Sequence, residues 1–242
     1  MTNIVTGAFD NLLFADLRRL HEASRDGALH VQLWSDELVQ RQTGKPPRFP
    51  QEERDYFLQA LRFVRHVQIL NQPLPEQIPP ITAAQLLEYP TDEFFKSSTM
   101  WELPTNRKKA VVTGCYDYFH SGHVRFFEEA SELGDLYVIV GSNANIRLLK
   151  GDHHPLFPAL QRQYIVSMVR HVRQALISTG SGWMDAEPEF DRINPDIYVV
   201  NEDGDKQEKK DWCAKHGVEY RVLTRLPRPG LPRRQSTFLR GF

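Results

Sequence analysis

The chain is poor in cysteine: Cys115 and Cys213 are the two thiols among its 242 residues. Cys115 falls in a predicted turn and Cys213 in a predicted helix, so a disulfide framework is not expected. Thiols that stay reduced fit a reducing compartment. We therefore expect a cytoplasmic protein.

Long apolar runs are also missing, because none approaches the roughly 20 residues that span a bilayer. Residues Met1 to Gly7 lack the basic segment and apolar core of a signal peptide, so none is expected. The formal net charge is −1, which gives no support for nucleic acid or an anionic membrane as a partner. With 40% hydrophobic and 25% charged residues, the composition is that of a globular protein with one large or two small domains.

The most informative part of the sequence runs from Gly114 to His123. A predicted buried strand, Lys109–Thr113, comes directly before it, and a predicted helix starts at Val124 directly after it. This stretch is therefore expected to form the turn from a strand into a helix.

The start of that helix has the features of a phosphate site. A helix N-terminus presents unpaired backbone N–H groups and the positive end of the helix dipole. Gly122 lets the backbone approach a ligand closely because it has no Cβ. His120 and His123 flank it and can donate hydrogen bonds to phosphate oxygens. A chance pair of histidines is the weaker reading, because strand, turn and helix occur together.

Two motifs, Gly114–Asp117 and His120–His123, resemble the signature of the nucleotidyltransferase superfamily with the HxGH motif. Its members include cytidylyltransferases for glycerol phosphate and ethanolamine phosphate, phosphopantetheine adenylyltransferase and heptose-phosphate adenylyltransferases. The resemblance covers Arg107 to Phe242. It implies an α/β fold with a Rossmann-like open parallel sheet and helices on both faces.

The chain also contains an internal repeat. Thr6–Asp10 matches Thr113–Asp117, and further along Arg54–Tyr56 matches Arg162–Tyr164. Each copy is predicted to run strand, helix, strand, loop, helix, strand. Matches at nearly constant spacing through successive elements indicate two tandem copies of one α/β unit.

The first copy lacks the groups that would bind phosphate. Its replacements are Leu13 for His120, Ala15 for Gly122 and Asp16 for His123. An aspartate at a helix start repels phosphate. We therefore expect residues 1–106 to be a silent, degenerate unit with a proline-rich linker, and residues 107–242 to be the catalytic domain. The silent copy either serves stability alone or imitates a homodimer interface, and the sequence leaves both open.

Three basic residues extend the resemblance. Lys150 lies in a predicted loop where related enzymes place a lysine that faces the triphosphate. Arg162 and Arg170 are predicted on one helix, and the family carries arginines at these positions, where a guanidinium can clamp phosphate. The silent copy keeps the matching Arg54 and Arg62, so a structural role for both arginines stays open.

Other candidates follow predicted strands. Trp183 stands in a glycine-rich loop, where it either stacks on a nucleobase or covers the core. Asn201 and Asp203 follow a predicted strand, at the edge of the sheet where ligands bind, although the family usually has a different turn here. The adjacent His153 and His154 do not have the spacing of a zinc site.

The C-terminal segment resembles the family's second phosphate motif. Arg234, Ser236 and Thr237 match an Arg…Ser-Thr segment whose hydroxyls and helix start hold the β- and γ-phosphates. Ser236 or Thr237 is also a good N-cap residue, which is the structural alternative.

The resemblance implies that a phosphate or phosphonate attacks the α-phosphate of a nucleoside triphosphate and that pyrophosphate leaves. The residues expected in catalysis are His120, His123, Lys150 and Arg234. The residues expected to bind the nucleotide are Gly114, Cys115, Tyr116, Asp117, Gly122, Arg162, Arg170, Trp183, Asn201, Asp203, Ser236 and Thr237. Mg²⁺ is expected to bridge phosphate oxygens mostly through water, and no protein residue is assigned as its ligand.

The tandem layout, the lysine and Trp183 favour CTP, with a small phosphorylated alcohol, polyol or phosphonate as acceptor. The alternatives are an adenylyltransferase that uses ATP and a sugar phosphate, and a nucleotide-binding scaffold without activity. The intact histidines and the Ser236-Thr237 tail argue against the scaffold. A homodimer and a single-chain protein both stay open.

Overall fold

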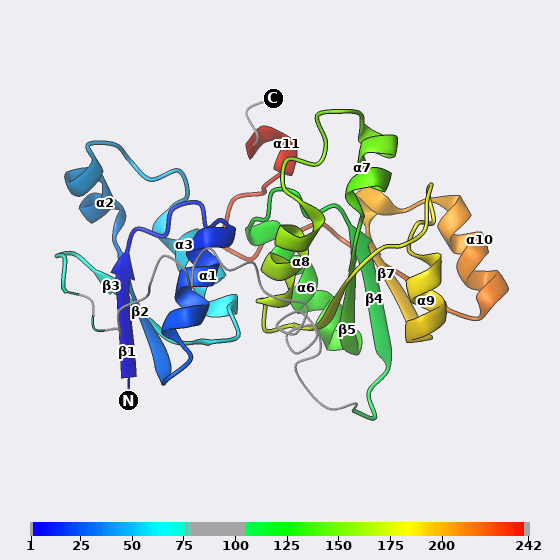
Figure 1. Cartoon of the computed structure of the whole chain (residues 1–242), viewed down its shortest axis with the longest axis horizontal. Coiled ribbons are helices and arrows are strands. Elements are labelled where there is room, and N and C mark those ends of the chain that lie inside the picture. Colours follow the sequence, from blue (N-terminus) through cyan, green and yellow to red (C-terminus); the bar gives the residue numbers. More distant parts are fainter. Residues whose placement is uncertain (1, 76, 78–104, 240–242) are drawn as a thin grey trace. The chain divides into compact units, whose positions relative to one another are not determined.

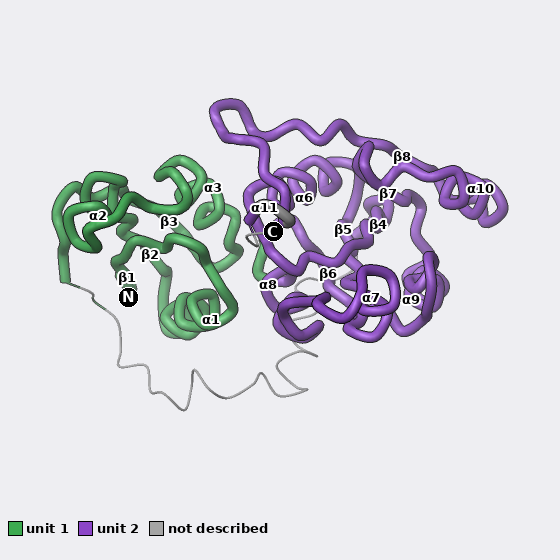
Figure 2. Tube along the Cα trace, turned by 90° about the horizontal axis from the view of Figure 1, so that it is seen from above, with its two compact units in different colours: residues 1–92, 168–170 green, residues 93–167, 171–242 purple. Residues whose placement is uncertain are grey.

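The computed structural model describes residues 2–75, 77 and 105–239, apart from the side chains of Thr237 and Phe238. The chain divides into two compact units (Figure 2). Unit 1 comprises residues 1–92 with 168–170, and unit 2 comprises residues 93–167 with 171–242. Most of the predicted proline-rich linker lies outside the described residues. Within the described ranges, no helix has both the length and the apolar character needed to cross a membrane.

Unit 1 is built on a parallel sheet with the strand order β1-β2-β3. Its elements are β1 (Thr2–Gly7), α1 (Phe14–Ala23), β2 (Ala28–Trp34), α2 (Asp36–Thr43), α3 (Gln51–Ala60) and β3 (Val64–Leu70). The central strand β2 buries alternate side chains, namely Leu29, Val31 and Leu33. Successive side chains of a strand point to opposite faces, so this alternation packs one face of β2 into the core.

Unit 2 is built on a five-stranded parallel sheet with the order β6-β5-β4-β7-β8. Its elements are β4 (Lys109–Gly114), α6 (Ser121–Leu133), β5 (Asp135–Val140), α7 (Asn143–Lys150), α8 (Ala159–Ser167), β6 (Val172–Ile177), α9 (Glu187–Ile193), β7 (Ile197–Asn201), the 3-10 turn η1 (Glu202–Gly204), α10 (Gln207–His216), β8 (Glu219–Leu223) and α11 (Ser236–Leu239).

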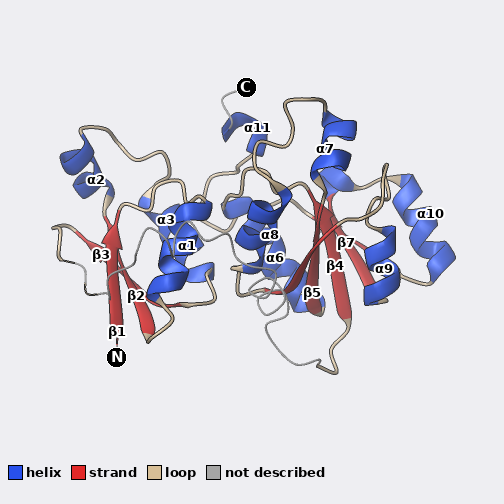
Figure 3. Ribbon diagram, viewed as in Figure 1, coloured by secondary structure: helices blue, strands red, loops and turns tan. Residues whose placement is uncertain are grey.

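Helices cover both faces of the unit 2 sheet. In β4, the consecutive residues Ala110, Val111 and Val112 are all fully buried, as expected for a parallel strand that is covered on both sides. Helices α6 and α8 lie on one side of the sheet, and α9 and α10 lie on the other (Figures 1 and 3). The predicted α/β architecture is confirmed.

Strand β4 lies where the chain reverses direction across the sheet. From β4 the chain proceeds to β5 and β6 on one side, and it then returns to β7 and β8 on the other. Loops diverge at such a point and leave a crevice beyond the carboxyl ends of the strands. The stretch from Gly114 to His123 leaves the sheet at this crevice.

Two segments predicted as loops are helices, α2 and α7. Ser35 and Ser142 precede them, and each hydroxyl accepts a hydrogen bond (3.2 Å) from the backbone N–H three residues further on. Gly44 and Gly151 end the helices with positive φ angles of 75° and 91°. An N-cap serine and a terminal glycine therefore stabilise both helices, and Lys150 is the last residue of α7.

The prediction that one helix runs through Arg170 is wrong. Helix α8 ends at Ser167. Beyond it, Val169 forms an isolated antiparallel bridge with Leu61, and the backbone N–H of Arg170 donates to the carbonyl oxygen of Ala60 (2.8 Å). These hydrogen bonds replace those that would continue the helix.

Candidate active site

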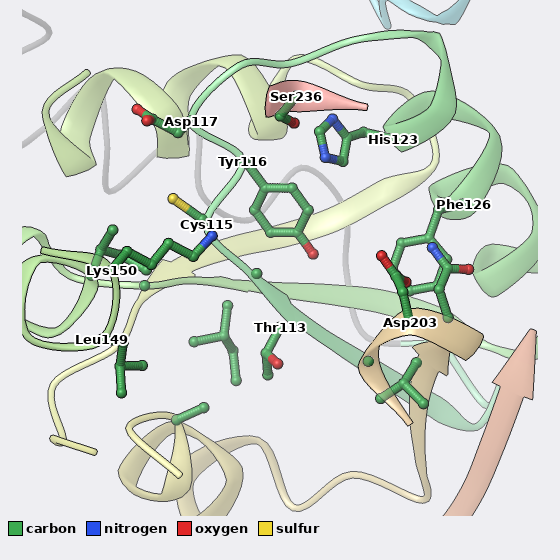
Figure 4. Close-up of a pocket in the computed structure, with 18 of the residues that line it drawn as sticks. Thr113, Cys115, Tyr116, Asp117, His123, Phe126, Leu149, Lys150, Asp203 and Ser236 are labelled. Atoms are coloured by element: carbon green, nitrogen blue, oxygen red, sulfur yellow. The ribbon is translucent and has the colours of Figure 1, made fainter. Parts of the chain in front are cut away.

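A cavity of about 910 Å³ lies at the carboxyl end of β4 (Figure 4). Its walls come from the ends of β4, β5 and β7, from helices α6, α7 and α10, and from the segment that leads into α11. The size is that of a small-molecule site. Its position agrees with the rule that ligands of open α/β sheets bind beyond the strand ends.

An aspartate fixes the turn that leads from β4 into this cavity. The carboxylate of Asp117 accepts hydrogen bonds from two consecutive backbone N–H groups, both at 2.8 Å. Asp10 does the same in unit 1, at 2.7 and 2.9 Å. Tyr116 and its counterpart Phe9 both have left-handed backbone conformations, with φ of 52° and 47°. The two units therefore share this turn, and Asp117 holds its shape.

A buried arginine braces the same turn. Arg162 donates to two backbone carbonyl oxygens, one of them that of Cys115, and to the side chain of Asn143, at 2.7 to 2.9 Å. In unit 1, Arg54 donates to three carbonyl oxygens, and it forms an ion pair with Asp36. Arg162 does not line the cavity. Its contacts support the structural alternative that the sequence left open.

The two motif histidines are held by the backbone at the start of α6. The backbone N–H of Gly122 donates to Nδ1 of His120 (3.1 Å), and that of His120 donates to Nδ1 of His123 (3.3 Å). The rings stack with their centroids 4.0 Å apart. Because each Nδ1 accepts a hydrogen bond, a neutral ring carries its proton on Nε2. Both imidazoles are therefore set up as Nε2–H donors.

Burial keeps both rings neutral. Desolvation, with the positive charges of Arg225 and Arg234, lowers the pKa of His120 to about 3. Desolvation also lowers the pKa of His123 well below its usual value, with further effects from His120, Arg225 and Lys150. At neutral pH the pair therefore donates hydrogen bonds without carrying charge.

Positive charge surrounds the histidines. Lys150 and Arg225 line the cavity, and Arg225 forms an ion pair with Asp203. Arg234 does not line the cavity, although its charge acts on His120 and its backbone oxygen accepts a hydrogen bond from Arg225 (3.4 Å). Fixed cations beside neutral N–H donors favour a polyanionic ligand.

The C-terminal segment contacts the first histidine. The hydroxyl of Ser236 donates to the carbonyl oxygen of Tyr118 (3.2 Å) and lies 3.3 Å from Nε2 of His120, which is placed to donate to it. Ser236 is the first residue of α11, so it does not occupy the predicted N-cap position. The side chain of Thr237 lies outside the described residues.

Trp183 stands on a loop that is tied to α7. Its side chain lines the cavity and is 52% exposed, so it does not cover the core. The side-chain amide of the buried Asn145 donates to the carbonyl oxygen of Gly182 (3.1 Å) and accepts from its N–H (2.8 Å). This pair of hydrogen bonds fixes the residue directly before Trp183.

The cavity brings together most of the predicted site residues. Those that line it are Gly114, Cys115, Tyr116, Asp117, His120, Gly122, His123, Lys150, Trp183, Asn201, Asp203 and Ser236. Arg170 does not line the cavity. It belongs to unit 1, where its guanidinium donates to the carbonyl oxygens of Leu61 and Val64, both at 2.9 Å.

Some lining residues were missed from the sequence. Asn145, Lys209 and Arg225 all reach the cavity. Lys209 lies early in α10, which follows β7, and Arg225 follows the end of β8. The rule that ligands bind beyond strand ends could have drawn attention to both basic residues.

No three His, Cys, Asp or Glu side chains gather as a metal site among the described residues. Of the carboxylates in the cavity, Asp117 is hydrogen-bonded to backbone N–H groups, Asp203 pairs with Arg225, and Asp185 accepts from Ser178.

Comparison with known sequences identifies the family. The cytidylyltransferase-like family model matches residues 111–221. A FAD synthase from Ferroglobus placidus is 34% identical over 119 residues, which are 48% of this chain and 74% of that protein. The chain belongs to the cytidylyltransferase-like family. It is thereby placed in the nucleotidyltransferase superfamily that its HxGH motif resembles, and its enzymatic class is that of a nucleotidyltransferase.

Further relatives of the family match the same half of the chain. A FAD synthase from Thermococcus kodakarensis is 35% identical over 126 residues, 50% of this chain and 82% of that protein. The bifunctional protein HldE from Nitratiruptor sp. is 37% identical over 142 residues, 55% of this chain. The matched region spans 29% of the length of that protein.

Proposed function

We propose that unit 2 transfers a nucleoside monophosphate from a nucleoside triphosphate to a small phosphorylated acceptor and releases pyrophosphate. The observation that carries this proposal is the pair of stacked, neutral imidazoles at the start of α6, whose Nδ1 atoms both accept backbone hydrogen bonds. Such donors are fixed before the reaction starts, and their hydrogen bonds strengthen as charge develops on a phosphate.

The reaction needs positioning more than covalent help from the protein. An oxygen of the acceptor phosphate attacks the α-phosphorus, and the bond from that phosphorus to the bridging oxygen of the pyrophosphate breaks. The attacking phosphate is already ionised, so no base has to remove a proton. His123 donates to the α-phosphate, and His120 donates to the leaving oxygen after its Nε2–H exchanges the Ser236 hydroxyl for the nucleotide. Lys150 and Arg234 attract the triphosphate, and Ser236 and Thr237 stand beneath it.

Mg²⁺ is proposed to enter with the triphosphate. The carboxylates of Asp117 and Asp203 already have partners, so phosphate oxygens and water are the ligands that fit this site best. When bound, the ion offsets negative charge on the phosphates.

Two nucleotides have support. Trp183, half exposed at the cavity, and the repeat favour CTP with a phosphorylated alcohol, polyol or phosphonate. The relatives named FAD synthase favour ATP, because FAD contains an adenosine monophosphate group. ATP with a sugar phosphate is a further form of the same reaction.

We propose that residues 1–106 take no direct part in this chemistry. Asp16 puts negative charge where unit 2 has His123, and Leu13 stands where unit 2 has the imidazole of His120. Unit 1 keeps the residues that hold the turn, Asp10 and Arg54. These contacts support a role as a folded but silent partner of the catalytic domain.

The test is pyrophosphate release by the full chain with Mg²⁺ and either CTP or ATP. Phosphorylated alcohols, polyols and sugars, with flavin mononucleotide among them, serve as acceptors.

His123→Ala is expected to lower the rate by about a hundredfold or more, the scale of losing a transition-state donor. His153→Ala is the matched control, because His153 is exposed and does not line the cavity. Release that is unaffected by His123→Ala would contradict the assignment, and no release with any pair would favour a non-catalytic scaffold.

A further inference from the structure

The hydroxyl of Tyr116 is buried in the cavity wall without a hydrogen-bond partner. The side chain is 5% exposed and lines the cavity, and its oxygen has no partner in the protein. A buried polar atom in this state is rare, because losing its hydrogen bond with water has to be compensated. A ligand in the cavity would supply the missing partner.

The direction of the hydroxyl is fixed by packing. The Tyr116 ring meets His123 and Phe127 edge to face, with centroid distances of 5.4 and 5.2 Å. In Figure 4 the hydroxyl points away from the turn at Asp117 and towards the side of the pocket where Asp203 lies. The ring therefore cannot turn away without giving up its packing.

Gly114 makes room for this hydroxyl. A Cβ at Gly114 would lie 2.7 Å from Cζ and 3.0 Å from the hydroxyl oxygen of Tyr116. In unit 1 the matching pair is Gly7 and Phe9, where the nearest ring atom would lie 3.4 Å from a Cβ. The left-handed turn is the same in both units. The hydroxyl occurs only in the unit that also has the two histidines.

The hydroxyl has the chemistry of a donor to an anion. Burial raises the pKa of Tyr116 well above its usual value, so the group stays protonated at neutral pH. It can then donate to a phosphate oxygen, and its ring already contacts the histidine assigned to the α-phosphate.

We propose that the Tyr116 hydroxyl donates a hydrogen bond to the α-phosphate of the bound nucleoside triphosphate, and that this oxygen is the atom through which Tyr116 binds the nucleotide. This inference rests on the proposed function, because it assumes that a nucleotide occupies the cavity. It assigns to one side-chain atom a role that the motif alone does not give.

The test is Tyr116→Phe, which removes one oxygen and restores the residue type of unit 1. Dissociation constants are measured by calorimetry for CTP and ATP, for the matching monophosphates and for inorganic pyrophosphate. The variant is expected to bind the triphosphate and monophosphate about tenfold more weakly, the scale of a hydrogen bond to a charged group. Pyrophosphate, which has no α-phosphate, is expected to bind as before.

Tyr198→Phe is the matched control. Its hydroxyl hydrogen-bonds Thr113 (2.8 Å) within the protein, and Tyr198 does not line the cavity. We expect this variant to unfold at a lower temperature and to bind nucleotide as the parent does. Tyr116→Phe, which leaves no polar atom unpaired, is expected to keep or raise the unfolding temperature of the free protein.

The outcomes separate the two proposals. A parent protein that binds no nucleoside triphosphate overturns the proposed function and this inference with it. If the parent binds nucleotide and the Tyr116→Phe variant binds it equally tightly, this inference alone is overturned. Equal weakening of pyrophosphate and monophosphate binding would also overturn it, because the effect would then not depend on the α-phosphate.

Discussion

Asp16 occupies at the start of α1 the position that His123 occupies at the start of α6. Each side chain accepts a hydrogen bond from the backbone N–H of the residue before its helix, from Leu13 at 2.9 Å and from His120 at 3.3 Å. The backbone N–H group directly before the helix therefore has a side-chain hydrogen-bond acceptor in both units. Only His123 combines this acceptor with a neutral N–H donor that can serve a ligand.

Replacing His123 by Asp should separate folding from chemistry. The aspartate can keep the hydrogen bond to the helix start, as Asp16 does, so the unfolding temperature is expected to change little. Its charge repels phosphate, so pyrophosphate release should fall by more than the roughly hundredfold expected from losing a donor alone. Thermal unfolding and the pyrophosphate assay check the two parts. Activity close to that of the parent would show that the imidazole is dispensable.

Removing either buried arginine should destabilise its own unit. Arg162→Ala removes the donor to two carbonyl oxygens and one of the two hydrogen bonds to Oδ1 of Asn143, and the expected cost is about 3 kcal/mol. Arg54→Ala should act similarly in unit 1. Urea unfolding followed by circular dichroism measures both.

Lys150→Ala is the contrasting variant for these measurements. Lys150 is exposed and ends α7, so its loss should lower nucleotide binding with little change in stability. If Arg162→Ala unfolded at the same urea concentration as the parent, the bracing role of Arg162 would be refuted.

Asn145→Ala should loosen the loop that carries Trp183. The backbone N–H of Gly182 donates to Oδ1 of Asn145. Losing this hydrogen bond should speed hydrogen exchange of the Gly182 backbone amide by tenfold or more, since about 1.4 kcal/mol corresponds to a factor of ten. Trp183→Ala is the control, because it leaves this hydrogen bond in place. Unchanged exchange in Asn145→Ala would show that other contacts hold the loop.

Acid should destabilise unit 1 through His21. Desolvation, together with the charges of Arg18, Arg25 and Arg62, lowers the pKa of His21 to about 4, below the usual value of about 6.5 in an unfolded chain. Between these values the unfolded state binds more protons, so stability falls as the pH falls from about 6.5 towards 4.

The check on His21 is urea unfolding at a series of pH values. His21→Gln should reduce the loss of stability between pH 6.5 and 5, because the glutamine does not titrate. His30→Gln is a suitable comparison in the same unit. A parent and a His21→Gln variant with identical pH profiles would show that this group does not govern the acid response.

The sequence predicted the strand, turn and helix around the HxGH motif because each part has a local signal. Apolar residues of β4 and β7 mark buried strands, and the glycine and histidines mark the turn. The helices α2 and α7 also had local signals, since Ser35 and Ser142 stand before them and Gly44 and Gly151 stand after them. Each helix has only eight residues, which is too short for a clear apolar periodicity, so the capping residues are its main local signal.

Other features depend on contacts between distant residues, which no local pattern contains. The pair of hydrogen bonds between Asn145 and Gly182 joins residues 37 positions apart. The hydrogen bond from the Arg170 guanidinium to the carbonyl oxygen of Leu61 joins residues 109 positions apart. The unpaired Tyr116 hydroxyl becomes visible only when the neighbours of its ring are known.

The groups that brace the turn after the first strand are distinct from those that face the cavity. Arg54 and Arg162 do the bracing in their respective units, whereas the imidazoles occur only in the second. The brace of this turn is therefore independent of the groups that we assign to the chemistry.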